Sequence, residues 1–266
     1  MRPDGPILET EMDDYGCSAA VLTAVEIETK SVRDRFSGWK RVSVPGDRQE
    51  YYKTVFERGG IEHSIVTAQQ AVMGMTAATL LATKMIYEFR PRYLIMCGIA
   101  AGIGDEAEEI YGDVIVPDMI WDYSTGKYVG PDESEIRFGD LGFLPRPVSV
   151  KPDSGILDII KAAADDPENE FHIHVGPMAC GSCVVANTEM VDKQIRALFP
   201  KTLGLDMESY SVCFAAESAS DPKPKPVVIK SICDYANSEK SDMYQKFAAY
   251  TSSGFLKYLL ENKLEF

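Results

Sequence analysis

The sequence has little positive charge, few histidines and tryptophans, and no long apolar stretch. Its 27 Lys and Arg residues stand against 41 Asp and Glu, which leaves a formal net charge of −14. Binding to duplex nucleic acid or to an anionic membrane surface needs clustered Lys and Arg, and the sequence contains no such cluster. The composition therefore argues against nucleic-acid and membrane partners.

The longest apolar stretch, near residues 93–103, falls short of the ~20 residues that a membrane-spanning helix needs and is typical of a buried strand. The first 16 residues are acidic and contain Pro and Gly, without the basic-then-apolar order of a signal peptide. The six cysteines are scattered through a chain that needs no disulfide to fold. We therefore expect a cytoplasmic protein with reduced thiols.

From Ser18 onward, apolar strand patterns alternate with helical ones. Strands are expected at residues 18–25, 93–98, 172–179, 203–207 and 227–233, and helices at 26–36, 73–89, 155–164, 189–199, from 208, and at 243–260. Such alternation predicts an α/β fold of three layers, in which helices cover both faces of a mostly parallel central sheet. We expect residues 18–266 to form one domain and residues 1–17 a weakly ordered extension.

Four segments interrupt the alternation. Arg58-Gly59-Gly60 predicts a hairpin between two strands, and residues 98–104 (GIAAGIG) predict a loop of small residues. Residues 113–123 (DVIVPDMIWDY) predict a further long strand, which Pro117 restricts to an edge or a bulge. Residues 124–150, rich in Gly, Pro and charge, are expected to be an insertion or a lid.

Three acidic residues follow predicted strands: Glu28, Glu208 and Asp234. The carboxyl ends of parallel strands converge on one edge of a sheet, so these side chains can share a pocket. Acids at helix starts also stabilise the helix dipole. The pattern alone leaves both interpretations open.

Four sequence blocks near these acids carry a family resemblance: AVEIE (24–28), GIAAGIG with GDVIVPD (within 98–118), LDMES (205–209) and SICDYANS (231–238). In this order they resemble the purine nucleoside phosphorylase/nucleosidase superfamily, and most closely its methylthioadenosine/S-adenosylhomocysteine nucleosidase branch. The resemblance implies hydrolysis of the N-glycosidic bond of a purine nucleoside or nucleotide, with adenine the expected base. It also implies a homodimer or larger homo-oligomer that uses no cofactor and no metal.

The resemblance assigns roles to the three acids. It implies that Asp234 protonates N7 of the purine, that Glu208 binds the ribose hydroxyls, and that Glu28 positions or activates water at the anomeric carbon. Breaking a ribose–purine bond passes through an oxocarbenium-like state, which fits an acid at the leaving base and a carboxylate opposite it. The implied substrate-binding residues are Met207, Val184, Val185, Gly98, Ala100 and Cys233.

The residues at the expected phosphate site favour water as the nucleophile. Phosphorylases of this family hold phosphate with arginines after the first strand and before the Gly-rich segment, where this chain has Glu26 and Glu28, and Met96 and Cys97. A carboxylate repels phosphate, so hydrolysis is predicted. A purine nucleoside phosphorylase is the alternative enzyme, and a non-catalytic nucleotide-sensing module is the alternative of another class.

The sequence departs from the nucleosidase pattern at CGSCVVAN (180–187), where Ser182 replaces an Asp and Val184 replaces the aromatic residue that stacks on the base. This departure and the long segment 121–150 are similar to nucleosidase domains of bacterial antiphage systems, whose implied activity is cleavage of ATP to adenine and ribose triphosphate. An ATP nucleosidase is therefore a further alternative, and the 5′ substituent stays open.

Charged and aromatic residues of the long segment are candidates for two roles. Lys127, Arg137 and Arg146 could contact a polyphosphate, although scattered surface charge is usually only solvated. A subunit contact or a lid is the role expected for the aromatic residues Tyr123, Phe138 and Phe143.

Three further motifs carry weaker signals. Cys180 and Cys183 have thioredoxin spacing but do not open a helix after an early strand, so a redox function is not expected. His172 and His174 point to one face of a predicted strand but lack an evident third ligand, and we interpret them as structural. Residues 98–104 lack G-x-G-x-x-G spacing, which argues against NAD binding.

Overall fold

The computed structural model describes residues 15–104, 109–128, 143–238 and 242–266. Its strands are β1 (Cys17–Thr23), β2 (Lys40–Val42), β3 (Tyr51–Arg58), β4 (Ile61–Gln69), β5 (Pro91–Gly102), β6 (Val114–Asp122), β7 (Gly126–Tyr128), β8 (Phe143–Pro145), β9 (Val148–Val150), β10 (Ile173–Cys180), β11 (Gly204–Asp206) and β12 (Lys225–Asp234). Its helices are α1 (Glu26–Asp34), α2 (Met75–Phe89), α3 (Ser154–Ala164), α4 (Thr188–Met190), α5 (Ser209–Glu217) and α6 (Gln245–Asn262), with a π-helical turn η1 (Val191–Arg196) and a 3₁₀ turn η2 (Asp242–Tyr244).

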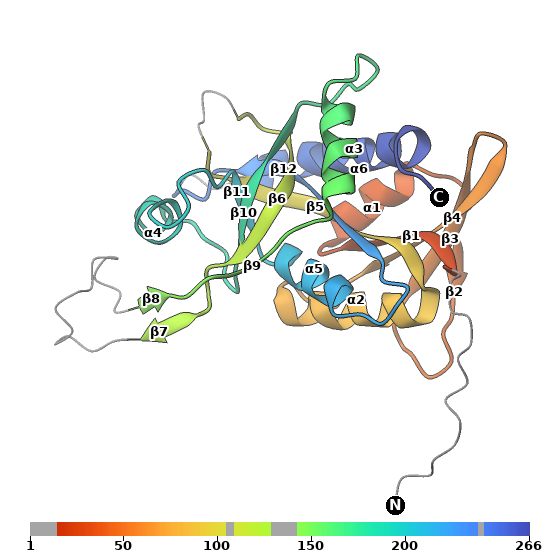
Figure 1. Ribbon diagram of the computed structural model, residues 1–266, viewed down its shortest axis with the longest axis horizontal. Coiled ribbons are helices and arrows are strands. Elements are labelled where there is room, and N and C mark those ends of the chain that lie inside the picture. The colour runs from red at the N-terminus through yellow and green to blue at the C-terminus, as the bar shows by residue number, and fades with distance from the viewer. Residues whose placement is uncertain (1–14, 105–108, 129–142, 239–241) are drawn as a thin grey trace, which may run out of the picture.

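Ten of the described strands form the main sheet, in the order β11-β10-β6-β12-β5-β1-β4-β3-β2, with β9 paired to β6. Strand β1 lies between β4 and β5 and is parallel to both, whereas the β3–β4 hairpin is antiparallel, as predicted. Helices cover both faces of this sheet (Figure 1). The predicted three-layer α/β fold is confirmed, with mixed rather than purely parallel pairing.

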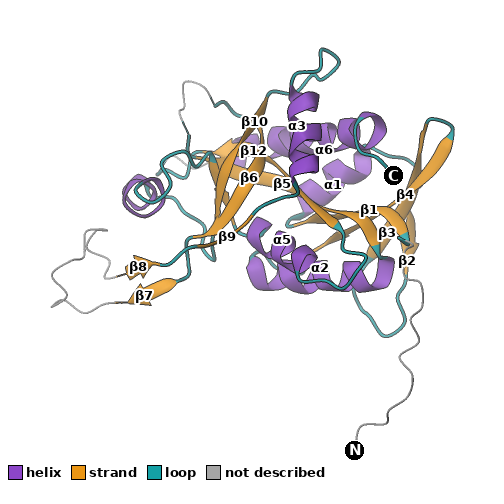
Figure 2. Ribbon diagram, in the orientation of Figure 1, coloured by secondary structure: helices purple, strands orange, loops and turns teal. Residues whose placement is uncertain are grey.

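Successive residues of β1 pack into opposite layers. Ala20 and Leu22 belong to the apolar cluster that contains α2 and α5, whereas Ala19 and Val21 pack with α1, α3 and α6. Figure 2 shows these two groups of helices on either side of the strands. Burial on both faces explains why the central strands read as continuous apolar runs in the sequence.

Strand β5 closes one half of the sheet into a ring. Its far end pairs with β11, which also pairs with β10, and both β10 and β12 pair with β6. The closure depends on small residues, because a Cβ at Gly204 would lie 2.9 Å from the Ala101 carbonyl oxygen and one at Gly102 would lie 3.0 Å from the Ile232 side chain. The prediction of a loop at residues 98–104 is therefore wrong, since β5 continues as a strand to Gly102.

Two other local predictions have definite outcomes. Strand β6 lies inside the sheet, and its pairing with β10 skips from Pro117 to Met119, so the bulge alternative is confirmed and the edge alternative is wrong. The helix expected at 189–199 is a short α4 followed by η1, in which the Ala197 N–H donates to the Asp192 carbonyl in the i→i+5 pattern.

The described part of the long segment forms three short strands. Strands β7 and β8 pair with each other as a small antiparallel ribbon, and β9 pairs with β6. Arg137 and Phe138 lie outside the described residues. Tyr123 is buried, and its hydroxyl donates to the Cys183 carbonyl (3.1 Å), so its expected place at a subunit contact or lid is wrong.

The predicted N-terminal extension falls largely outside the described residues, which begin at Tyr15. Of its last residues, Gly16 donates its N–H to the Arg90 carbonyl (2.8 Å) and Cys17 opens β1. Among the described helices, none is both long enough and apolar enough to cross a membrane.

Candidate active site

A cavity of about 740 Å³ opens where β1, β5, β10, β11 and β12 end. It brings together the three acids that the sequence places after separate strands. Of the predicted site residues, all but Gly98 line it, namely Glu28, Ala100, Val184, Val185, Met207, Glu208, Cys233 and Asp234.

Glu28 lies in the first turn of α1 and is 2% exposed. Its Oε2 accepts hydrogen bonds from the N–H groups of Ala24 (2.6 Å) and Val25 (3.1 Å), and its Oε1 accepts one from Ile99 (2.8 Å). Burial raises the pKa of Glu28 above its usual range, although Lys230 and the backbone hydrogen bonds act in the opposite direction. A fixed carboxylate with a raised pKa is suited to taking a proton from water near neutral pH.

Gly98 lies directly beside the Glu28 carboxylate and does not line the cavity. A Cβ at this position would lie 2.1 Å from Glu28 Oε1, a distance that real Cβ atoms do not show. Glycine therefore leaves the space in which the Glu28 carboxylate reaches the Ile99 N–H. Its contribution to the site is to position Glu28.

Glu208 caps the start of α5 and is 4% exposed. Its Oε1 accepts hydrogen bonds from the Gly74 N–H (2.8 Å) and from Gln70 Nε2 (3.2 Å), both in the loop before α2. Gly74 has a φ of +110°, which favours glycine and lets this loop turn toward the carboxylate. Oε2 lies 3.5 Å from Nζ of Lys230.

Lys230 is completely buried in the middle of β12, and its Nζ lies 3.0 Å from Asp206 Oδ2. Burial alone would lower the pKa of Lys230, but the carboxylates of Asp206, Glu208 and Glu28 raise it well above its usual range. The lysine is therefore a cation that offsets the negative charge of the site. Asp206 also accepts hydrogen bonds from the Ser209 N–H (3.1 Å) and from the Ser209 hydroxyl.

Asp234 ends β12 at the cavity wall and is 3% exposed. Its Oδ1 accepts the Ala236 N–H (2.9 Å), and Ala236 has a φ of +54°, so the chain turns sharply after the acid. The Cys233 thiol lies 3.4 Å from Oδ2. The turn that follows β12 thus holds one carboxyl oxygen of Asp234 in place.

Part of the cavity lining is apolar. Val185 is buried, Val184 is 55% exposed, and Met207 lies beside the Gly74 backbone. Cys183 is the exposed member of the Cys180–Cys183 pair, and neither forms a disulfide. Cys180 is buried at the end of β10, and burial raises the pKa of its thiol. A buried thiol with a raised pKa is a poor nucleophile.

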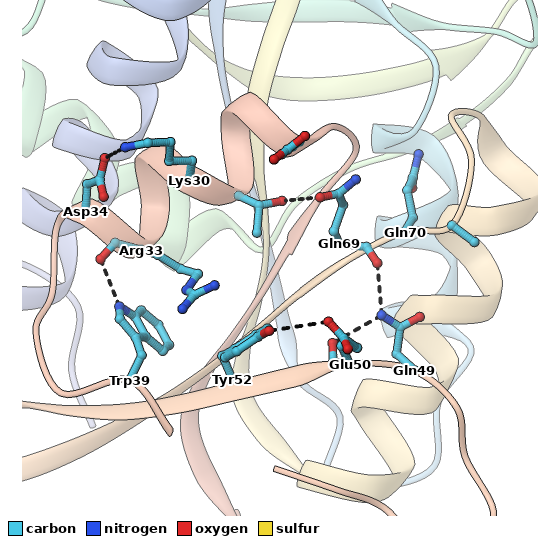
Figure 3. A pocket seen from close by; sticks show the side chains of 12 residues that line it. Lys30, Arg33, Asp34, Trp39, Gln49, Glu50, Tyr52, Gln69 and Gln70 are labelled. Atoms are coloured by element: carbon cyan, nitrogen blue, oxygen red, sulfur yellow. Dashed lines mark hydrogen bonds and ion pairs between the residues drawn. The ribbon is translucent and has the colours of Figure 1, made fainter. Parts of the chain in front are cut away.

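The rim of the cavity is polar, and a second cavity adjoins it. Glu26, Lys30, Asp242, Gln245 and Lys246 line the rim. The second cavity has a volume of about 670 Å³ (Figure 3). It shares Glu26 and Lys30 with the first. On its wall, the Arg33 guanidinium lies 4.0 Å above the Tyr52 ring, and Lys30 pairs with Asp34.

A family model gives this geometry its context. The model of the phosphorylase superfamily matches residues 18–261, which is nearly the whole chain. The chain belongs to the phosphorylase superfamily.

Relatives within the superfamily differ in length. An uncharacterised protein of Sinorhizobium fredii is 28% identical over 84% of this chain and 55% of its own length. A death domain-containing ATP nucleosidase of Amphimedon queenslandica is 26% identical over 93% of this chain and 48% of its own length. This chain therefore spans about half the length of these two curated relatives.

A shorter relative and a solved structure match end to end. The 5′-methylthioadenosine/S-adenosylhomocysteine nucleosidase of Staphylococcus haemolyticus is 23% identical over 91% of this chain and 98% of its own length. The solved nucleosidase of Neisseria meningitidis, in complex with methylthio-immucillin-A, has a TM-score of 0.70 at 24% identity over 92% of this chain and 98% of that one. The two chains share the superfamily fold.

Two charged residues of this candidate site were not predicted from the sequence. Lys230 and Asp206 are buried beside Glu208, and the available signal was a lysine inside the apolar strand pattern 227–233. Conversely, Lys127 and Arg146 are exposed and do not line the cavity, so the described part of the long segment supplies it with no cation.

Proposed function

We propose that this chain hydrolyses the N-glycosidic bond of a purine nucleoside or nucleotide and releases the free base, with adenine the expected base. The observation that carries the proposal is the meeting of Glu28, Glu208 and Asp234 in one cavity of a phosphorylase-superfamily fold. The Staphylococcus haemolyticus and Amphimedon queenslandica relatives are both named as nucleosidases, which agrees with this reaction class.

The proposed reaction breaks the bond between C1′ of the ribose and N9 of the purine. The bonding electrons leave with the base, and Asp234 donates a proton to N7, so the base departs neutral. The oxygen of a water molecule forms the new bond to C1′, and Glu28 takes the proton that this water loses. The hydrogen bonds from Ala24, Val25 and Ile99 hold the Glu28 carboxylate in one orientation for that step.

Glu208 is proposed to accept hydrogen bonds from the ribose hydroxyls. Gln70 and the Gly74 N–H fix its orientation, and the Lys230 ammonium lies 3.5 Å from its Oε2. An ionised acceptor makes the stronger hydrogen bond to a hydroxyl. It also places negative charge near the sugar, which becomes positive in the oxocarbenium-like state.

Hydrolysis is favoured over phosphorolysis by the charges around the nucleophile. No arginine occurs among the described residues that line the cavity. The Glu28 carboxylate occupies the position after β1, while Met96 and Cys97 are buried in β5. A carboxylate at that point repels phosphate and can activate water.

A nucleotide is the second candidate substrate. Lys30 and Lys246 line the rim of the cavity, and the polar second cavity continues from Lys30 past Arg33. Cations at this place suit a 5′ phosphate or polyphosphate, and the Amphimedon queenslandica relative is named as an ATP nucleosidase. A role in antiphage defence is proposed only together with this nucleotide substrate.

Two further proposals concern the setting of the enzyme. All six cysteines are free thiols, which agrees with a reducing cytoplasm. We also propose a homodimer or larger homo-oligomer, in keeping with the family resemblance of the sequence.

The test is to incubate the purified chain with methylthioadenosine, S-adenosylhomocysteine, adenosine, AMP, ATP and inosine, with and without phosphate, and to measure free base by chromatography. Asp234→Asn should lower the rate by about 10²–10⁴-fold, the usual contribution of a positioned acid. Replacing Lys30 and Lys246 by Ala should raise KM for ATP and leave KM for methylthioadenosine unchanged if the nucleotide candidate is right. Release of base only with phosphate would contradict hydrolysis, and no base from any substrate would favour the sensing module.

A further inference from the structure

A cluster of two imidazoles and one carboxylate lies outside the cavity. His172 Nδ1 is 2.9 Å from Asp113 Oδ2, and His174 Nε2 is 2.8 Å from the same oxygen. The three atoms all lie within 4.8 Å of one another. The interpretation of the histidines as lacking a third ligand is therefore wrong, because Asp113 supplies it from a different part of the chain.

The strand pairing explains why these residues meet. His172 and His174 are separated by one residue, so their side chains leave the same face of the chain that opens β10. Strand β10 runs parallel to β6 with Ile173 opposite Val114, and the Val114 N–H donates to the His172 carbonyl (2.9 Å). Asp113, directly before Val114, is thereby held beside both imidazoles.

The carboxylate is fixed before any ligand binds. Asp113 Oδ2 accepts the Ile110 N–H (3.2 Å), and the Asp113 carbonyl accepts the Ile232 N–H (3.0 Å) from β12. The Asp113 side chain is 5% exposed, that of His174 17% and that of His172 66%. The cluster thus has a rigid buried acid and an open side through which an ion can enter.

We propose that Asp113, His172 and His174 bind a divalent transition-metal ion, with Zn²⁺ as the preferred ion. Zn²⁺ takes imidazole nitrogen and carboxylate oxygen at about 2.0–2.2 Å, so two ligand atoms of a tetrahedral site lie roughly 3.3–3.5 Å apart. The observed contacts of 2.8 and 2.9 Å need only a small opening to admit the ion. Water completes the coordination on the exposed side of His172.

The position of the cluster suggests a structural effect. None of its three residues lines the catalytic cavity. The Asp113 carbonyl, however, is bonded to Ile232 in β12, the strand that ends at Asp234. A bound ion would join β6 to β10 beside β12, and would raise the unfolding temperature without taking part in the reaction.

The site can be tested independently of the nucleosidase activity. Metal-free protein carrying Cys183→Ser, which removes the exposed thiol, is titrated with Zn²⁺ by calorimetry and with Co²⁺ by visible absorption. We expect one equivalent to bind and the unfolding temperature to rise with the Zn²⁺ concentration. Asp113→Asn and His174→Ala should each weaken binding by at least about tenfold, because even the loss of a hydrogen bond that supports a metal ligand costs 10–100-fold.

His63 provides the matched control, because it is the remaining histidine of the chain and packs against Phe266, with 4.5 Å between the ring centroids, away from the cluster. His63→Ala should bind Zn²⁺ as the parent does. The proposal is overturned if the parent binds no Zn²⁺ at micromolar concentrations, or if the combined His172→Ala and His174→Ala variant binds as tightly as the parent. Circular dichroism of each variant separates loss of the site from loss of the fold.

Discussion

Replacing Lys230 by methionine should destabilise the protein and weaken substrate binding together. Methionine keeps most of the length of the side chain but removes the charge that lies 3.0 Å from Asp206 and 3.5 Å from Glu208. Both carboxylates are buried, and removing one partner of a buried ion pair costs about 3–5 kcal/mol. In a chain of this size, each kcal/mol lowers Tm by roughly 2–4 °C.

The assay combines thermal unfolding with steady-state kinetics. Lys225→Met is the matched control, because Lys225 is the exposed first residue of the same strand, and its replacement should change stability by no more than about 0.5 kcal/mol. Adding Asp206→Asn to Lys230→Met should restore part of the lost stability, since one of the two uncompensated charges disappears. KM should rise in Lys230→Met, because Glu208 loses the cation that lies 3.5 Å from its Oε2 and is held less firmly for the ribose hydroxyls.

The reasoning about Lys230 fails if Lys230→Met and Lys225→Met unfold at the same temperature. It also fails if Asp206→Asn destabilises the Lys230→Met protein further, because the two carboxylates would then not depend on the lysine for compensation.

Two other predictions concern Glu28. Gly98→Ala would place a Cβ 2.1 Å from Glu28 Oε1, so it should reduce kcat as strongly as Glu28→Gln does. Gly155→Ala, whose Cβ would meet only Asp153 at 3.1 Å, is the control and should leave kcat unchanged. Equal kcat values for Gly98→Ala and Gly155→Ala would show that Gly98 does not position Glu28. Because burial raises the pKa of Glu28 above the ordinary 4.5, its protonated form appears at a higher pH than in a free glutamate. As the pH is lowered, the rate should therefore begin to fall at a pH above 4.5. If Glu28→Gln still shows the same fall in rate at acid pH, another group is responsible for it.

The regular part of the fold was accessible from local sequence patterns. The apolar runs that form β1, β5 and β12 are buried on both faces. Continuous apolar runs are typical of strands that are buried in this way. The end of β5 was not accessible, because Gly and Ala are both depleted in strands and Gly is typical of turns. Here they extend a strand whose backbone approaches Gly204 closely, and that approach depends on a partner distant in sequence.

The candidate site divides in the same way. Glu28, Glu208 and Asp234 could be selected because each stands at a strand end within a family motif. Lys230 and Asp206 were not predicted, because the partners of a buried ion pair are neighbours in space and not in sequence. The same is true of Asp113 beside His172. A polar residue within an apolar strand pattern is the trace that such pairs leave in a sequence.

The pairing of β5 with β12 has a consequence for the order in which the chain is made. Strand β5 precedes β6, β10 and β11 in the sequence, while β12, its partner along most of its length, is the last of the described strands to be synthesised. Until β12 arrives, the ribosome-bound chain carries an apolar strand with one unpaired edge, which is prone to association with other chains. Because Asp234 and Lys230 arrive on β12, the same event covers that edge and completes the candidate site, so a partly made chain has no competent pocket.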